Sequence, residues 1–205
     1  MQPNREKVIL TGFMGTGKTT VGRLIATLLE YEFVDTDELI EMRHGPITEI
    51  FKRSGQDRFR ELESAIAVEL ADATGTVIAT GGRMMLDPEN AANLAAGAHV
   101  FCLVARPEDI AERVAGSDRP LLDHEDPAAR IEQLLDERHA GYSEFRAVDT
   151  SGREPVEIAA DIVRQVQQAH NNRTPVDPSS TAPSMPRGLR AMLASWRRYR
   201  ARGRR

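Results

Sequence analysis

The sequence predicts an α/β fold with three layers, in which a five-stranded parallel sheet is covered by helices on both faces. Short apolar runs alternate with segments of helical periodicity over the first 170 residues, and this alternation is typical of a parallel sheet with crossover helices. Three of the runs lead directly into glycine or aspartate clusters, at residues 12–19, 35–37 and 81–82. Since right-handed crossovers bring the carboxyl ends of parallel strands to one edge, we expect these clusters to converge there.

The elements follow from the pattern in chain order. The expected strands are residues 8–10, 32–34, 77–79, 99–104 and 147–149. The expected helices are residues 18–29, 38–44, 47–71, 88–94, 107–115 and 127–145, and a last core helix with apolar residues at 156, 159, 160, 163 and 166. Residues 116–126 are polar and contain proline, so we expect a mobile lid there.

The composition predicts one globular domain over residues 1–170 and a flexible linker with a basic tail over residues 171–205. The chain has a single cysteine, which excludes an intrachain disulfide, and its start lacks the pattern of a signal peptide. No apolar run has the length of a membrane span. These features favour a cytoplasmic protein without a membrane partner, and we expect a monomer.

Charge is distributed unevenly along the chain. The tail contains nine arginines and one acid, Asp177, so the net charge of −4 divides into +8 for the tail and −12 for the core. An acidic core argues against nucleic-acid binding by the domain. The tail has the charge for such a partner, and its stripe of Leu189, Met192, Leu193 and Trp196 could also dock on a membrane or a helix. The alternative is a disordered basic terminus without a folded role.

The first cluster matches the phosphate-binding motif G-x-x-x-x-G-K-[ST] over residues 12–19. Its glycines allow backbone N–H groups to surround phosphate oxygens, and the following helix directs its positive end at the same anion. Lys18 supplies a charge for the β- and γ-phosphates, and the Thr19 hydroxyl can ligate Mg²⁺. The predicted ATP-binding residues in this segment are Gly15, Thr16, Gly17, Lys18, Thr19 and Thr20.

Two carboxylates follow the second expected strand, at Asp35 and Asp37. Beside a triphosphate, one of them could serve the water shell of Mg²⁺ and the other the hydroxyl of the acceptor. The structural alternative is that Asp37 caps the helix that follows it.

Several further motifs occur in a fixed order, and together they resemble the shikimate kinase family, within the nucleoside-monophosphate-kinase-like branch of P-loop folds. After the phosphate-binding loop they are Asp35-Thr36-Asp37, Phe59-Arg60-x-x-Glu63, Thr80-Gly81-Gly82, Arg119-Pro120-Leu121-Leu122 and Arg138-x-x-x-Tyr142-x-Glu144. The resemblance extends from about residue 8 to residue 168. It implies a P-loop kinase fold and transfer of phosphate from ATP to the 3-hydroxyl of shikimate, a step in aromatic amino acid biosynthesis.

The resemblance also implies acceptor-side roles. Asp37 would position or deprotonate the acceptor hydroxyl, and Asp35 would hold Mg²⁺ through water. Arg60 and Arg138 would bind the shikimate carboxylate, which suits the planar guanidinium fork. The remaining implied contacts are the Gly82 backbone at a substrate hydroxyl, Glu63 orienting Arg60, and Phe51 and Phe59 walling the acceptor site. Taken singly, Arg60 and Glu63 could equally be surface helix decoration, and the two phenylalanines could be core residues.

On the nucleotide side, the resemblance implies that Arg119 reaches the transferring phosphate from the lid, which makes it catalytic together with Asp37 and Lys18. Arg113 and the segment from Arg153 to Pro155 would sandwich the adenine.

One position departs from the family, which usually has three glycines where this chain has Gly81-Gly82-Arg83. If the third position requires positive φ, an arginine strains the backbone; if it does not, a long cation stands beside the acceptor site. This leaves two alternatives to shikimate phosphorylation. One is a kinase of another small hydroxy acid or sugar acid such as gluconate, and the other is a nucleotide-binding regulatory protein whose tail binds nucleic acid.

Overall fold

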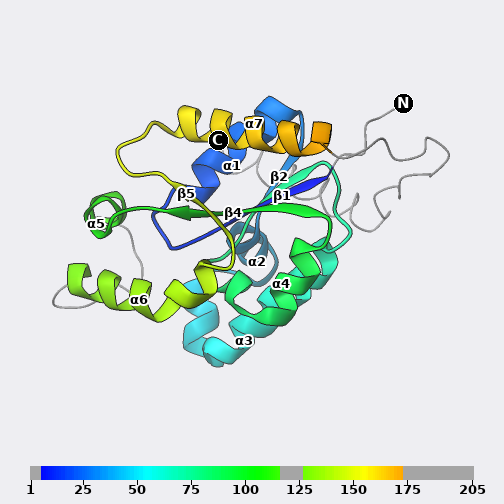
Figure 1. Ribbon diagram of the computed structural model, residues 1–205. Coiled ribbons are helices and arrows are strands. Elements are labelled where there is room, and N and C mark those ends of the chain that lie inside the picture. The colour runs from blue at the N-terminus through cyan, green and yellow to red at the C-terminus, as the bar shows by residue number, and fades with distance from the viewer. Residues whose placement is uncertain (1–5, 116–126, 173–205) are drawn as a thin grey trace, which may run out of the picture.

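A computed structural model describes residues 6–115 and 127–172 of the 205-residue chain (Figure 1). The five strands are β1 (Lys7–Thr11), β2 (Glu32–Asp35), β3 (Thr76–Ala79), β4 (Ala98–Val104) and β5 (Arg146–Asp149). They form one sheet in the order β2-β3-β1-β4-β5, and all neighbouring pairs are parallel. The predicted five-stranded parallel sheet is therefore confirmed.

Helices cover both faces of this sheet, as predicted (Figure 1). In the described ranges the helices are α1 (Lys18–Leu29), α2 (Thr36–His44), α3 (Ile47–Leu70), α4 (Pro88–Ala95), α5 (Pro107–Val114), α6 (Pro127–Tyr142) and α7 (Pro155–Asn172), with a short 3-10 helix, η1 (Met84–Leu86). Alternate residues of β1 show the two faces: Ile9 packs with the α2, α3 and α4 side, whereas Val8 and Leu10 pack with α1 and α7.

A third apolar cluster lies at the carboxyl ends of β1 and β4. It combines Phe13 of the loop after β1 and Cys102 of β4 with side chains of α5 and α6, including Ile110 and Tyr142. The cluster fixes α5 and α6 beside the glycine loop, so the second half of the domain is anchored to the phosphate-binding end of the first.

Local deviations from the expected elements have identifiable causes. The helix expected from residue 38 begins at Thr36, because Asp35 caps it. A kink at Gly55, with φ 76° and ψ 179°, divides α3. The η1 turn follows Arg83 and was not expected from the pattern. The predicted lid at residues 116–126 and the tail from residue 173 lie outside the described residues.

Among the described helices, none combines the length and the apolar composition that crossing a membrane requires.

Candidate active site

The loop between β1 and α1 has a backbone conformation that requires glycine at three positions. Gly12, Gly15 and Gly17 adopt φ values of 123°, 77° and 92°, which side chains of L-residues rarely tolerate. A Cβ at Gly12 would lie 2.2 Å from the carbonyl oxygen of Leu103 in β4. The loop is therefore held tightly against the neighbouring strand, and α1 starts at Lys18 with its N-terminus directed at the loop.

Side chains inside the loop complete its shape. The Lys18 ammonium donates to the carbonyl oxygens of Gly12 at 2.9 Å and Phe13 at 2.8 Å. The buried Thr16 hydroxyl donates to the same Phe13 carbonyl at 2.8 Å. Lys18 thus crosses the mouth of the loop, where a bound phosphate chain would compete for its ammonium group. Thr20, the next residue but one, is exposed on α1.

Asp35, the last residue of β2, connects this strand to α1, the helix that follows the glycine loop. Its Oδ2 accepts a hydrogen bond of 2.6 Å from the Thr19 hydroxyl, and its Oδ1 accepts the backbone N–H groups of Asp37 at 3.1 Å and Glu38 at 3.3 Å. Asp35, and not Asp37, is therefore the N-cap of α2, and the alternative that Asp37 acts as the cap is wrong. The Asp37 carboxyl remains available for another role.

The Thr19 and Asp35 oxygens fit the donor set that Mg²⁺ prefers. They are hard ligands, lie 2.6 Å apart and stand beside the loop that would carry the phosphates. A Mg²⁺ ion that keeps several waters needs only one or two such protein groups together with phosphate oxygens.

Asp37 lies in an environment that disfavours its charge. Its Oδ1 atom is buried and has no hydrogen-bond partner in the described part of the chain. Burial, followed by the nearby charges of Asp35 and Glu63, raises the pKa of Asp37 to about 7, while the Lys18 charge acts in the opposite direction. A carboxyl with this pKa can accept a proton near neutral pH, as a general base must.

Gly81 leaves room for two buried carboxylates. A Cβ at this position would lie 2.6 Å from Oδ1 of Asp37 and 2.7 Å from Oε1 of Glu63. The Gly81 backbone N–H donates a hydrogen bond of 2.8 Å to the Thr36 hydroxyl. The loop after β3 is thereby fixed against the start of α2, close to Asp37.

Arg60 is oriented by its own helix. Its guanidinium pairs with the buried Glu63 one turn later and lies over the Phe59 ring, with 5.2 Å from Cζ to the ring centroid. Burial raises the Glu63 pKa, and the Arg60 charge opposes this shift. Phe59 packs on Phe51 at a centroid distance of 5.1 Å; Phe59 belongs to the core cluster that α3 helps to form, and the partly buried Phe51 packs against that cluster. The expected orienting pair is therefore present, while Phe51 and Phe59 also serve the core.

Arg138 is a cation buried in the domain. The residue is 5% exposed, its Nε has no hydrogen-bond partner among the described atoms, and its Cζ lies 5.1 Å from the Phe13 ring centroid. A Cβ added to Gly82 would lie 3.7 Å from the Arg138 Nη1 atom. Burying a guanidinium costs free energy unless hydrogen bonds or an anion compensate it, so Arg138 is suited to bind an anionic group beside Gly82.

Tyr142 is a site residue to which the sequence alone assigned no role. Its hydroxyl donates to the Gly82 carbonyl oxygen at 2.5 Å, across 60 positions of sequence. Burial raises the pKa of the Tyr142 phenol, so the hydroxyl keeps the proton that it donates. The available signal was its spacing of four residues from Arg138, which places both side chains on one face of α6.

Arg83 follows these glycines without backbone strain. Its φ of −113° and ψ of −7° are ordinary for an arginine, so positive φ is not required at this position. The residue is exposed, and its charge acts on Glu63 and Tyr142. Of the two alternatives stated above, the structure supports a long cation beside the acceptor-side residues.

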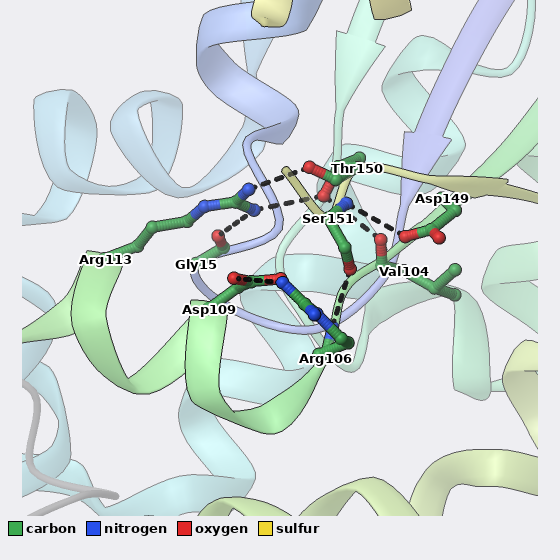
Figure 2. Close-up of polar contacts among 8 residues, drawn as sticks. All are labelled: Gly15, Val104, Arg106, Asp109, Arg113, Asp149, Thr150 and Ser151. Atoms are coloured by element: carbon green, nitrogen blue, oxygen red, sulfur yellow. Dashed lines mark hydrogen bonds and ion pairs between the residues drawn. The ribbon is translucent and has the colours of Figure 1, made fainter. Parts of the chain in front are cut away.

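The predicted adenine-side residues surround the turn between β5 and α7. Arg113 of α5 donates to the Gly15 carbonyl at 3.4 Å and to the Thr150 hydroxyl and carbonyl at 3.0 and 2.8 Å (Figure 2). Arg153 donates to the Asp149 carbonyl at 3.2 Å and pairs with Asp161 of α7. Pro155 begins α7. Arg119, the predicted lid residue, lies outside the described residues.

The parallel sheet carries a glycine loop at one edge, and carboxyl and guanidinium groups gather at the same edge. This combination of fold and site defines a P-loop kinase. The shikimate kinase family model matches residues 14–167, and the chain belongs to that family. A shikimate kinase of Caldanaerobacter subterraneus subsp. tengcongensis is 42% identical over 163 residues, which cover 78% of this chain and 95% of that protein.

Solved structures agree with the family assignment. A shikimate kinase from Acinetobacter baumannii in complex with shikimate superposes with a TM-score of 0.77 at 32% identity, covering 80% of this chain and 94% of that one. A gluconokinase from Sinorhizobium meliloti reaches a TM-score of 0.59 at 22% identity, with 82% and 95% covered. The second likeness is one of fold alone.

Proposed function

We propose that this protein transfers the γ-phosphoryl group of ATP to the 3-hydroxyl of shikimate, giving ADP and 3-phosphoshikimate. The family assignment supports this reaction, and the two rival functions are not favoured by it. The observation that carries the proposal is the buried Arg138 guanidinium beside Gly82, on the same sheet edge as the glycine loop and Asp37. An acceptor bearing both a carboxylate and a hydroxyl satisfies Arg138 and Asp37 together.

The nucleotide side needs little protein chemistry beyond positioning. The backbone N–H groups of residues 15–20 and the Lys18 ammonium would hold the β- and γ-phosphates. Thr19 would ligate Mg²⁺ directly and Asp35 through water; the ion, when bound, neutralises phosphate charge. Arg119 would stabilise the transferring group, and Arg113, Arg153 and Pro155 would contact the adenine.

On the acceptor side, Arg138 and Arg60 would bind the carboxylate, and the backbone of Gly82 would contact a ring hydroxyl. Asp37 would accept the proton of the attacking 3-hydroxyl as the oxygen–phosphorus bond forms and the bond from the γ-phosphorus to the ADP oxygen breaks. The pKa of about 7 suits this transfer because the carboxyl is neither permanently protonated nor a very weak base. Glu63 and Tyr142 would act indirectly, by orienting Arg60 and the Gly82 loop.

We also propose that residues 1–170 form the catalytic domain, that residues 171–205 are an appended linker and basic tail, and that the enzyme works as a cytoplasmic monomer. The tail has the charge for nucleic-acid binding, whereas the acidic core does not.

Product analysis tests the reaction directly. The protein is incubated with ATP and Mg²⁺ and one of shikimate, quinate or gluconate, and the phosphorylated carbon is assigned by NMR. Phosphate on the 3-oxygen of shikimate is expected. A phosphorylated gluconate with unchanged shikimate would replace the proposal by the sugar-acid alternative.

A further inference from the structure

Helix α5 connects the glycine loop with the turn between β5 and α7. Gly15 packs directly on α5, because a Cβ there would lie 2.8 Å from a methyl carbon of Val114 and 3.4 Å from one of Ile110. At the N-terminus of α5, the Ser151 hydroxyl accepts a hydrogen bond of 3.0 Å from the backbone N–H of the N-cap residue Arg106 (Figure 2). Any ligand that spans the glycine loop and this turn therefore meets groups whose positions depend on α5.

Thr150 is the centre of the contacts at this turn. It is 1% exposed, its N–H donates to the Val104 carbonyl at 2.9 Å, and its hydroxyl donates to the same oxygen at 3.1 Å. The hydroxyl and the carbonyl of Thr150 then accept two hydrogen bonds from Arg113, which also reaches Gly15. Figure 2 shows the Arg113 guanidinium lying between Gly15 and Thr150.

The hydroxyl of Thr150 uses its donor and an acceptor position at once. Without it, the Nη1 atom of Arg113 would keep only the 3.4 Å contact with Gly15, which is long for a hydrogen bond. The Nη2 bond to the Thr150 carbonyl alone would allow the guanidinium plane to rotate about a single contact. Arg113 is an exposed residue, so within the described ranges these hydrogen bonds to Gly15 and Thr150 are what hold its guanidinium plane.

We propose that Thr150 is a positioning residue for nucleotide binding: its buried hydroxyl sets the orientation of the Arg113 guanidinium between the glycine loop and the β5–α7 turn. This inference rests on the proposed function, in which Arg113 contacts the adenine of ATP. It assigns to Thr150 an effect on nucleotide affinity and none on the acceptor, because the proposed acceptor-side residues belong to α2, α3, α6 and the loop after β3.

The test measures ADP binding by calorimetry in four single variants and in the double variant that combines Thr150→Val with Arg113→Ala. Thr150→Val removes the hydroxyl at nearly constant volume, Thr150→Ser retains it, and Arg113→Ala removes the group that it orients. Ser151→Ala is the matched control, because this neighbouring hydroxyl contacts Arg106 and not Arg113. If Thr150→Val does not fold, Thr150→Ala takes its place.

Thr150→Val is expected to weaken ADP binding about tenfold, as loss of a hydrogen bond to a charged group does. Thr150→Ser and Ser151→Ala are expected to stay within about twofold of the parent, and Thr150→Val should add nothing in the Arg113→Ala background. Unchanged ADP affinity in Thr150→Val, equal losses in Thr150→Val and Ser151→Ala, or a full additional loss in the Arg113→Ala background would each overturn the proposal.

Steady-state kinetics separates this proposal from the proposed function. Thr150→Val should raise KM for ATP about tenfold and leave KM for shikimate unchanged, whereas a general loss of structure would move both constants. ADP binding requires no acceptor. Normal ADP binding in a protein that fails to phosphorylate shikimate would therefore contradict the proposed function and leave the Thr150 test intact.

Discussion

At the scale of single residues, the Asp37 carboxyl combines a proposed catalytic role with a cost to stability. Its pKa in the folded protein is about 7, above the ordinary value of 3.8, chiefly because of burial. The folded state thus binds this proton more tightly than the unfolded state, so the Asp37 contribution is most favourable below about pH 4 and is lost as pH rises towards and through 7.

Asp37→Asn should therefore raise stability while abolishing activity. We expect the free energy of unfolding without ligands to exceed that of the parent by about 2 to 4 kcal/mol at pH 8, with the difference shrinking towards pH 4, because the amide does not ionise. Turnover should fall by about 10² to 10⁴-fold. Urea unfolding at both pH values, with turnover measured beside it, checks this. A variant less stable than the parent at pH 8 would contradict the assigned environment.

Arg83 stands where the family usually has a third glycine. Because its backbone dihedrals are ordinary, we expect its replacement to change the stability of the fold only slightly. Arg83→Ala should change the free energy of unfolding by less than about 0.5 kcal/mol. It should raise KM for shikimate a few-fold at low salt, because an exposed cation near Glu63 attracts an anionic acceptor, and the effect should fade at high salt. A lower KM for shikimate in Arg83→Ala would indicate that Arg83 obstructs the acceptor instead.

At the scale of elements, the loop after β3 is fixed from two sides. Gly81 lies against Asp37 and Glu63, and Tyr142 of α6 holds the Gly82 carbonyl. The proposed acceptor side is thus assembled from α2, α3, α6 and one loop that contacts all three. Its geometry depends on how closely that loop approaches the helices.

The two glycines of this loop should respond differently to the same substitution. Gly81→Ala would place a methyl group within 2.7 Å of two carboxylate oxygens, so we expect a loss of about 1 to 3 kcal/mol in stability. Gly82→Ala, whose nearest neighbour would be 3.7 Å away, should cost less than about 1 kcal/mol. Denaturant unfolding of both variants checks the difference. Equal losses of stability in the two variants would contradict a dominant role for the close approach at Gly81.

The elements that the sequence predicted well are those with a local signal. The apolar runs located all five strands, and the glycine motif located the start of α1 at Lys18. The choice of Asp35 over Asp37 as the cap of α2 was not predictable, because both carboxylates flank the same strand end and the backbone conformation decides between them. The contact between Tyr142 and Gly82 joins positions 60 residues apart, which no local pattern encodes.

At the scale of the whole molecule, we propose that the reaction is confined to the acidic domain. The described strands and helices end at Asn172, and the family model ends at residue 167. The basic tail thus follows the part of the chain that the family shares, and its nine arginines give it a charge opposite to that of the domain.

Removal of residues 173–205 should leave catalysis unchanged. We expect kcat and both KM values within about twofold of the parent, since these residues lie outside the part of the chain that the family model matches. The full chain, but not the truncated one, should be retained on heparin and released as salt rises, because charge contacts with a polyanion are screened. The full and the truncated chain are run on the same heparin column with the same salt gradient, and their elution positions are compared. A loss of turnover on truncation would place the tail in the catalytic cycle.

In the proposed reaction, the glycine loop and the acceptor side act together on shikimate. The most direct test is the initial rate of ADP release from ATP and Mg²⁺, with and without shikimate, in the parent, Lys18→Ala and Asp37→Asn. A strong shikimate-dependent rate in the parent, lost in both variants, is the predicted result. ADP release that is independent of shikimate, or that survives in Asp37→Asn, would contradict the account.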